Sequence, residues 1–248
     1  MILGDSITHG ANGDWTWRYR LWQWLHYNTT LSPEFVGPFK GTFLDDGDPN
    51  TEFDTSGKYH AGTDGVFLTT SSGHAAYWGR ALAQSKDTVS QWTRDHQPEY
   101  LLVMLGFNDL GWFVTDVAGA LANTQKFIEE ARRAKPDVKF FFANIVDRAF
   151  LGGREDLVKN TKEYNQRLPG LLQSMASSRS FVKLVDVNTA YECRPEGCPD
   201  AYDGLHPNPH GEYDIALAFS VAMVQAGFGA SPLVVPFCGM SSPYTCPF

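Results

Sequence analysis

Residues 1–8 read MILGDSIT, a short apolar run followed at once by small and polar residues. We interpret residues 1–3 as a buried strand and Ser6 as the corner at which that strand ends and a helix begins. A serine at such a corner exposes its Oγ, and its own N–H points into the same space with the dipole of the helix behind it. An ordinary helix N-cap is equally compatible with this stretch taken alone.

Further apolar runs alternate with longer amphipathic segments along the chain. The predicted strands are residues 1–3, 35–36, 100–105, 138–146 and 181–187. The predicted helices are residues 15–27, 82–95, 115–135, 155–177 and 208–226. Thr115 is expected to cap the third, which stops before Pro136, and Pro169 to kink or divide the fourth. This alternation predicts an α/β fold, with a mostly parallel sheet covered by helices on both faces.

Size and composition limit the class of protein. The 248 residues suit one large domain, so we predict a single domain over residues 1–248. Hydrophobic residues make up 43%, which excludes wholesale disorder. The net charge is −8 and the chain has no basic run, so we predict no nucleic-acid partner. No run of about 18 apolar residues is present, so we predict no transmembrane segment.

Two segments do not follow the alternation of strands and helices. Residues 38–75 are rich in Gly, Thr, Ser and Asp and show no strong periodicity. Loops of that length are usually functional or contain small elements of their own, so we predict an insertion loop that overhangs the reactive edge of the sheet. Residues 229–248 are predicted to form a coil that a disulfide ties down.

The four cysteines all lie in the last quarter of the chain: Cys193, Cys198, Cys238 and Cys246. They allow three pairings, of which we favour the two local ones, Cys193–Cys198 and Cys238–Cys246. Histidines or paired CxxC motifs at zinc-ligand spacing are absent. Two disulfides indicate an oxidising compartment, so we expect a secreted, extracellular protein that has already lost its signal peptide.

Polar residues follow two more of the predicted elements. Asn108 lies just past the strongest predicted strand, in LGFND, where its side-chain amide can reach the space above the sheet. Asp203 and His206, in DGLHP, precede the last predicted helix. A carboxylate three residues before a histidine can bind the imidazole Nδ1–H, which leaves Nε2 free to act as a general base. Asp109 is expected to form structural hydrogen bonds.

In the order GDSIT, GFND and DGLHP, these blocks resemble the signature of the GDSL or SGNH hydrolases over residues 4–226. The resemblance implies a three-layer α/β/α, flavodoxin-like fold, with a parallel five-stranded sheet in the order 2-1-3-4-5. It also implies the roles of nucleophile for Ser6, base for His206, orienting acid for Asp203 and oxyanion donor for Asn108. Ile7 replaces the leucine of the family motif.

The family also contributes a glycine N–H to the oxyanion hole, and two glycines compete for that role. Gly65, in HAGTDG, resembles the version in carbohydrate esterases, and Gly79, in YWGRA, resembles another version that precedes a helix. Gly79 leaves room for one helix and one strand before Asn108. We therefore favour Gly79, with Ser6 and Asn108 as the other donors.

The resemblance implies a serine esterase that forms an acyl-enzyme and requires no metal or other cofactor. We expect a monomer that acts on short acyl esters, such as acetyl esters, of a carbohydrate or small molecule. The polar loop at residues 38–75 would make a poor lining for a long acyl chain. The alternatives are a lipase or phospholipase with the same machinery and, from a different class, a catalytically silent binding module.

Overall fold

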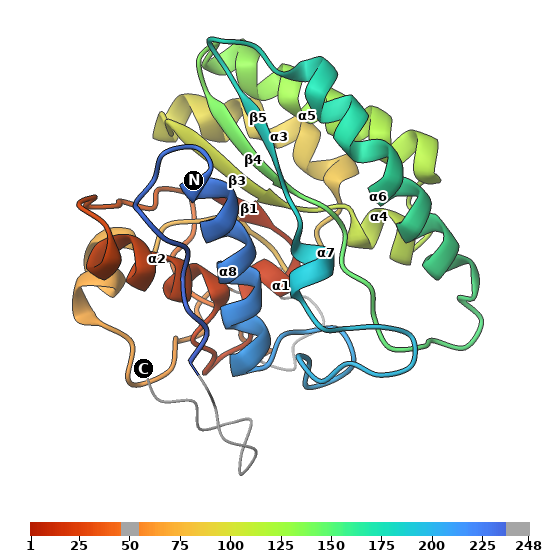
Figure 1. Cartoon of the computed structure of the whole chain (residues 1–248), viewed down its shortest axis with the longest axis horizontal. Helices are drawn as coiled ribbons and strands as arrows, with labels where there is room; N and C mark the ends of the chain where they lie inside the picture. Colours follow the sequence, from red (N-terminus) through yellow and green to blue (C-terminus); the bar gives the residue numbers. More distant parts are fainter. Residues whose placement is uncertain (46–54, 237–248) are drawn as a thin grey trace.

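The computed structural model describes residues 1–45 and 55–236 (Figure 1). Its centre is a sheet in which all neighbouring strands are parallel and the order is β2-β1-β3-β4-β5. The strands are β1 (Ile2–Gly4), β2 (Ala75–Ala76), β3 (Tyr100–Met104), β4 (Lys139–Ala143) and β5 (Val182–Val185). This topology confirms the predicted fold class and strand order.

Helices cover both faces of the sheet. They are α1 (Ser6–His9), α2 (Trp17–Asn28), the π-helical turn η1 (Phe67–Ser71), α3 (Leu82–His96), α4 (Phe107–Gly111), α5 (Val117–Ala134), α6 (Asp156–Met175), α7 (Val187–Ala190) and α8 (Pro209–Val224). Helices α3, α5 and α6 pack in a row on one face, and α2 packs against α8 on the other (Figure 1). The loops at the carboxyl ends of the strands therefore converge at one edge.

Aromatic and branched residues explain why the central strands lie in the core. Strand β4 carries three consecutive phenylalanines, Phe140, Phe141 and Phe142, and all three are fully buried. A strand with both faces covered by helices needs apolar residues on both faces rather than an alternating pattern. Helix α8 begins as predicted, because the Asn208 side chain accepts the N–H groups of His210 (3.0 Å) and Gly211 (3.1 Å).

One predicted strand was wrong. Residues 35–36 lie outside the sheet, and its edge is formed instead by the two alanines of β2. Just beyond residues 35–36, Phe39 exchanges two antiparallel backbone hydrogen bonds with His74, at 3.0 and 2.8 Å. The apolar side chains of residues 35–36 pack against the core without joining the ladder.

Two predicted helix details also differ. Asp116 rather than Thr115 caps α5, since its side chain accepts the Gly119 N–H at 2.8 Å. Helix α6 runs through Pro169 without being divided. Proline there removes one hydrogen bond to the preceding turn, and the buried Leu168 and Leu172 on either side anchor the helix to the core.

The described part of the loop at residues 38–75 contains small elements of its own. They are the turn η1 and isolated bridges that join Thr42 to Gly57 and Phe43 to Ala11. Cys193 and Cys198 form a disulfide, as their spacing predicts. Cys238 and Cys246 lie outside the described residues. Within residues 1–45 and 55–236, no helix combines the length and apolar character needed to cross a bilayer.

Candidate active site

Ser6 is the first residue of α1 and lies directly beyond the end of β1. The preceding residue, Asp5, caps this short helix because its Oδ1 accepts the Ile7 N–H at 3.0 Å. Burial raises the pKa of Asp5 to about 7. The turn is tight: a Cβ on Gly4 would come within 2.1 Å of Thr8 Oγ1. Ser6 is only 6% exposed, and its Oγ lies 2.9 Å from Nε2 of His206.

His206 and Asp203 lie on the loop just before α8. The second ring nitrogen of His206, Nδ1, is 2.6 Å from Oδ2 of Asp203. The other carboxylate oxygen, Oδ1, accepts the backbone N–H groups of His206 (2.8 Å) and Leu205 (3.0 Å). Burial opposes ionisation of Asp203, but these N–H groups and the imidazole hold its pKa below the ordinary value. Ser6, His206 and Asp203 thus form one continuous chain of contacts.

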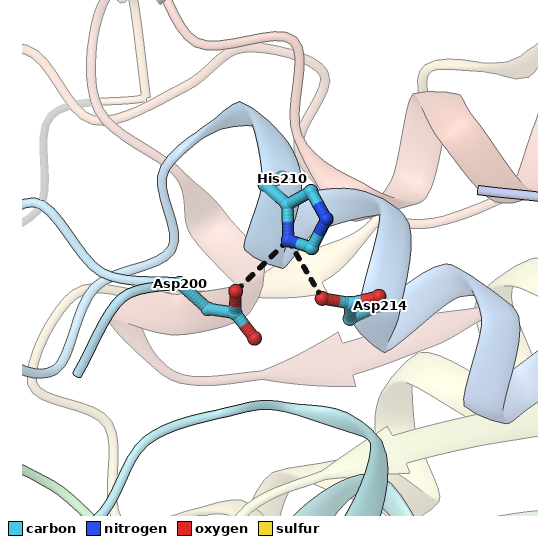
Figure 2. Close-up of side chains that lie close together, drawn as sticks. All are labelled: Asp200, His210 and Asp214. Carbon is cyan, nitrogen blue, oxygen red and sulfur yellow. Dashed lines mark hydrogen bonds and ion pairs between the residues drawn. The ribbon is translucent and has the colours of Figure 1, made fainter. Parts of the chain in front are cut away.

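The loop that carries this pair is anchored to α8 by a cluster of two buried carboxylates and the half-buried His210. Figure 2 shows the His210 imidazole between the carboxylates of Asp200 and Asp214, with Nδ1 at 2.9 and 3.0 Å from the two oxygens. The remaining oxygen of Asp200 accepts the Glu192 N–H. Burial alone would lower the pKa of His210, but Asp200 and Asp214 raise it. Burial, and then the charge of Asp200, raise the pKa of Asp214 to about 7.

Asp200, His210 and Asp214 also offer one metal-ligand atom each, and these atoms lie within 4.8 Å of one another. The hydrogen bond of His210 to Asp200 and its ion pair with Asp214 account for that proximity (Figure 2). The cluster steadies the loop: the carbonyl of Asp200 accepts the Asn208 N–H at 2.8 Å, two residues after His206. We therefore interpret the cluster as an anchor for the loop that carries Asp203 and His206.

Asn108 lies on α4, directly beyond the end of β3, and is 4% exposed. Its Nδ2 donates to the carbonyl of Arg80 at 3.0 Å, and its Oδ1 accepts the indole N–H of Trp112 at 2.7 Å. Gly106, the N-cap residue of α4 two positions before Asn108, has φ +116°, a left-handed conformation that favours glycine. The amide of Asn108 is therefore held at both of its polar atoms, beside the segment that contains Gly79.

Gly79 follows β2 in a turn that runs from Tyr77 to Arg80. The N–H of Arg80 donates to the carbonyl of Tyr77 at 3.2 Å, and Gly79 has φ +74° at the third position of the turn. A type II turn needs a positive φ there, which explains the glycine. The competing Gly65 is exposed beside α2, next to Asp64, whose carboxylate accepts the Tyr27 hydroxyl at 2.8 Å.

Asp109 has the structural role that we expected. Its carboxylate accepts the N–H groups of Leu82 (2.6 Å) and Ala83 (2.9 Å), the first two residues of α3. Burial raises the pKa of Asp109, although these two N–H groups oppose the shift. The residue after Asn108 thereby ties α4 to the start of the helix that follows Gly79.

Aromatic side chains around His206 were not predicted. The Trp78 ring stacks on the imidazole with centroids 4.5 Å apart, and Phe43 stacks on Trp78 at 4.6 Å. Tyr202 is also nearly parallel to the imidazole, at 5.9 Å. Phe43 belongs to the loop at residues 38–75, so the described part of that loop does reach the site. In the sequence, the only indication that Trp78 lies near the site is its position next to Gly79, a predicted site residue.

Comparison with known proteins identifies a family and one curated relative. Residues 40–212 match the GDSL-like Lipase/Acylhydrolase family, a segment that contains Gly79, Asn108, Asp203 and His206 and begins after Ser6. A multidomain esterase of Ruminococcus flavefaciens is 25% identical over 222 residues, which make up 85% of this chain and 26% of that protein. The chain thus spans about a quarter of the length of that relative.

Solved structures share the fold. A carbohydrate esterase family 3 protein from Talaromyces cellulolyticus has a TM-score of 0.67 and 21% identity, over 91% of this chain and 96% of that one. A family 3 carbohydrate esterase from Clostridium thermocellum has a TM-score of 0.64 and 22% identity, over 92% and 98% of the two chains. At these sequence identities, the structural similarity shows a shared fold only. The chemistry has to be argued from the residues of the site.

Proposed function

This chain belongs to the GDSL-like lipase/acylhydrolase family, and from that premise we propose that it is a serine esterase that hydrolyses short acyl esters, with acetyl esters of a carbohydrate as the preferred class. The observation that carries the proposal is the chain of contacts from Ser6 Oγ to His206 Nε2 (2.9 Å) and from His206 Nδ1 to Asp203 (2.6 Å). A hydroxyl, an imidazole and a carboxylate in this order form a nucleophile, a base and an orienting group.

The reaction proceeds in two halves. Ser6 Oγ attacks the ester carbonyl while its proton passes to His206 Nε2, and collapse of the tetrahedral intermediate breaks the ester C–O bond. His206 returns the proton to the departing alcohol, which leaves an acyl group on Ser6. Water then gives a proton to His206 and attacks the carbonyl of the acyl-enzyme. When this second tetrahedral intermediate collapses, its bond to Ser6 Oγ breaks and His206 returns the proton to Oγ, which releases the acid and restores the Ser6 hydroxyl. Asp203 stabilises the imidazolium that forms in each half.

The oxyanion of each tetrahedral intermediate needs donors that are already in place. We assign this role to the N–H groups of Ser6 and Gly79 and to the Asn108 amide. Support comes from the hydrogen bond between Asn108 Nδ2 and the carbonyl of Arg80, which places the amide beside the Gly79 turn. Loss of one donor typically costs about 10²–10³ in turnover, so Asn108→Ala should fall in that range.

Two observations favour a carbohydrate ester over a lipid. The curated relative is named an esterase, and the two solved structures are described as carbohydrate esterases. Exposed aromatic rings also border the site: Trp112 is 58% exposed and bonded to Asn108, and Tyr202 is 44% exposed and parallel to His206. Flat apolar faces of this kind suit the C–H face of a sugar ring.

The test is a series of nitrophenyl esters with acyl chains of two to eight carbons, together with an acetylated oligosaccharide. We expect kcat/KM to fall as the chain lengthens, and acetate to be released from the oligosaccharide. Ser6→Ala should abolish both activities, whereas replacement of an exposed serine, Ser32→Ala, should leave them unchanged. Rising kcat/KM, or rapid release of fatty acid from phospholipid vesicles, would favour the lipase alternative. Ligand binding without hydrolysis would favour the binding module.

The disulfide supports a proposal about location. Cys193 and Cys198 are bonded, and such bonds persist in oxidising compartments. We therefore propose that the enzyme works outside the cell. We also propose that residues 1–248 fold as one domain and that this domain is monomeric. Fractionation of producing cells, with activity measured in the medium and in the cell extract, tests the location.

A further inference from the structure

We propose that Trp112 is a positioning residue for the oxyanion hole: its indole N–H fixes the orientation of the Asn108 amide, so that a free N–H of Nδ2 faces the reacting carbonyl. This inference rests on the proposed function, because it takes Asn108 to be an oxyanion donor. It adds the residue that decides which way that donor points.

The geometry begins with the spacing in the chain. Trp112 follows Asn108 by four residues at the end of α4, and its backbone N–H donates to the Asn108 carbonyl at 3.1 Å. Residues four apart lie on the same side of a helical turn, so the two side chains meet. There the indole Nε1–H donates to Oδ1 at 2.7 Å, while Nδ2 donates to the carbonyl of Arg80 at 3.0 Å.

These two bonds assign the atoms of the amide. Oδ1 is matched with a donor-only group, the indole N–H, and Nδ2 with an acceptor-only group, the Arg80 carbonyl. The NH₂ group of asparagine has two N–H donors, so one remains after the bond to Arg80. A flipped amide would place Oδ1 against the Arg80 carbonyl and Nδ2 against the indole N–H. One acceptor would then face another acceptor, and one donor would face another donor.

Loss of the indole N–H leaves a buried oxygen without that partner. Because Asn108 is 4% exposed, water does not readily replace the lost donor, and the amide keeps only its anchor at Arg80. Rotation about that single anchor moves the free N–H away from the oxyanion. The bond from the indole also polarises the amide and strengthens its N–H groups as donors. Both effects act on the transition state, and so on kcat.

The ring of Trp112 offers a second contribution that can be separated from the first. It is 58% exposed, next to the still more exposed Phe113. Trp112→Phe keeps an aromatic face for a substrate to contact and removes only the N–H. Trp112→Ala removes both, and Phe113→Ala removes a neighbouring exposed ring without touching Asn108.

The test is a double-mutant cycle between Trp112→Phe and Asn108→Ala. We expect Trp112→Phe to lower kcat about three- to tenfold, the cost of one hydrogen bond, with KM unchanged within about twofold. In the Asn108→Ala background the same change should have no further effect on kcat. Substitution of a benzothiophene amino acid at position 112, which replaces the N–H by sulfur, should match Trp112→Phe. Phe113→Ala should leave kcat unchanged.

Three results would overturn the inference: an unchanged kcat in Trp112→Phe, an equal loss of kcat in the Asn108→Ala background, or an effect confined to KM. Nuclear magnetic resonance provides a readout that is independent of activity, because the Asn108 Nδ2 protons should exchange faster with solvent in Trp112→Phe than in the parent protein. If the parent protein has no esterase activity, the proposed function fails, and this exchange rate alone then decides whether Trp112 holds the amide.

Discussion

Asp203 contacts His206 through both of its carboxylate oxygens. Oδ2 lies 2.6 Å from the ring Nδ1, and Oδ1 accepts the backbone N–H of the same residue at 2.8 Å. The backbone bond fixes where the carboxylate lies, and the ring contact fixes the plane and the tautomer of the imidazole. One side chain thereby directs Nε2 at Ser6 and favours the tautomer in which Nδ1 carries the proton.

This relationship predicts an order of mutational effects. His206→Ala should lower kcat at least as much as Asp203→Ala. The imidazole transfers the proton itself, whereas the carboxylate only orients the imidazole and stabilises the imidazolium charge. Asp203→Asn should also be strongly impaired, since an amide NH₂ facing Nδ1 favours the wrong tautomer. Steady-state kinetics with a nitrophenyl acetate measures all three variants. Asp87→Ala, at an exposed carboxylate, is the control. A silent Asp203→Ala would reduce the triad to a dyad.

Glu212 predicts how stability changes with pH. It is buried, with its Oε1 accepting the Thr16 N–H at 2.6 Å, and burial raises its pKa to about 7 despite the nearby charge of Arg20. In the unfolded chain the pKa of Glu212 has its ordinary value of about 4.3. Between this pH and about pH 7, Glu212 therefore holds a proton in the folded protein that it has lost in the unfolded chain. As the pH rises from the unfolded pKa to the folded pKa, a buried carboxyl of this kind lowers the free energy of unfolding by up to about 1.4 kcal/mol per pH unit.

Thermal unfolding from pH 4.5 to 8 measures this effect. Glu212, Asp5 and Asp214, all with pKa values raised to about 7, should lower the melting temperature as the pH rises through this window. Burial lowers the pKa of the amino terminus of Met1 and of His74, so these two groups act in the opposite direction and make the fall shallower. Glu212→Gln retains an acceptor for Thr16 and should flatten the slope, whereas the exposed Glu129→Gln should not. A slope that Glu212→Gln leaves unchanged would show that Glu212 is ionised in the folded protein.

The cysteines predict a stability effect and a bonding pattern. Replacing Cys193 and Cys198 together by alanine should lower the free energy of unfolding by about 2 kcal/mol, because the bond closes a short loop and restricts the unfolded chain. Denaturant unfolding checks the magnitude. Mass mapping of the non-reduced protein should find Cys238 bonded to Cys246. A bond from Cys193 to either of these would contradict the local pairing.

The sequence revealed the central strands because their chemistry is local. The run of phenylalanines in β4 indicates burial without any knowledge of its neighbours. Strand β2 was not predictable in this way. It consists of Ala75 and Ala76, which have little preference for strand, and only their pairing with Leu3 and Gly4 of β1 makes them the edge of the sheet. Residues 35–36 are more hydrophobic than the two alanines, so their local sequence favoured a strand there. That prediction was wrong.

The site shows the same division between local and tertiary signals. Ser6, Asn108 and the Asp203–His206 pair lie in short motifs that place them at strand ends, and the structure brings their segments together. The stacking of Trp78 on His206 depends on two segments far apart in the chain, so no pattern predicted it. The contact of Trp112 with Asn108 could have been found from their spacing only if helix α4 had been predicted, since Trp112 caps α4 four residues after Asn108 and a helical turn places both side chains on one side.

The measurement that tests the central claim most directly is covalent labelling of the nucleophile. A fluorophosphonate reacts with a serine that a neighbouring base activates, and digestion followed by mass spectrometry locates the adduct. We predict one adduct, on Ser6, that is absent in Ser6→Ala, formed much more slowly in His206→Ala and unchanged in Ser32→Ala, with esterase activity lost in step with labelling. An adduct on another serine, or full activity in Ser6→Ala with an unchanged circular dichroism spectrum, would contradict the account.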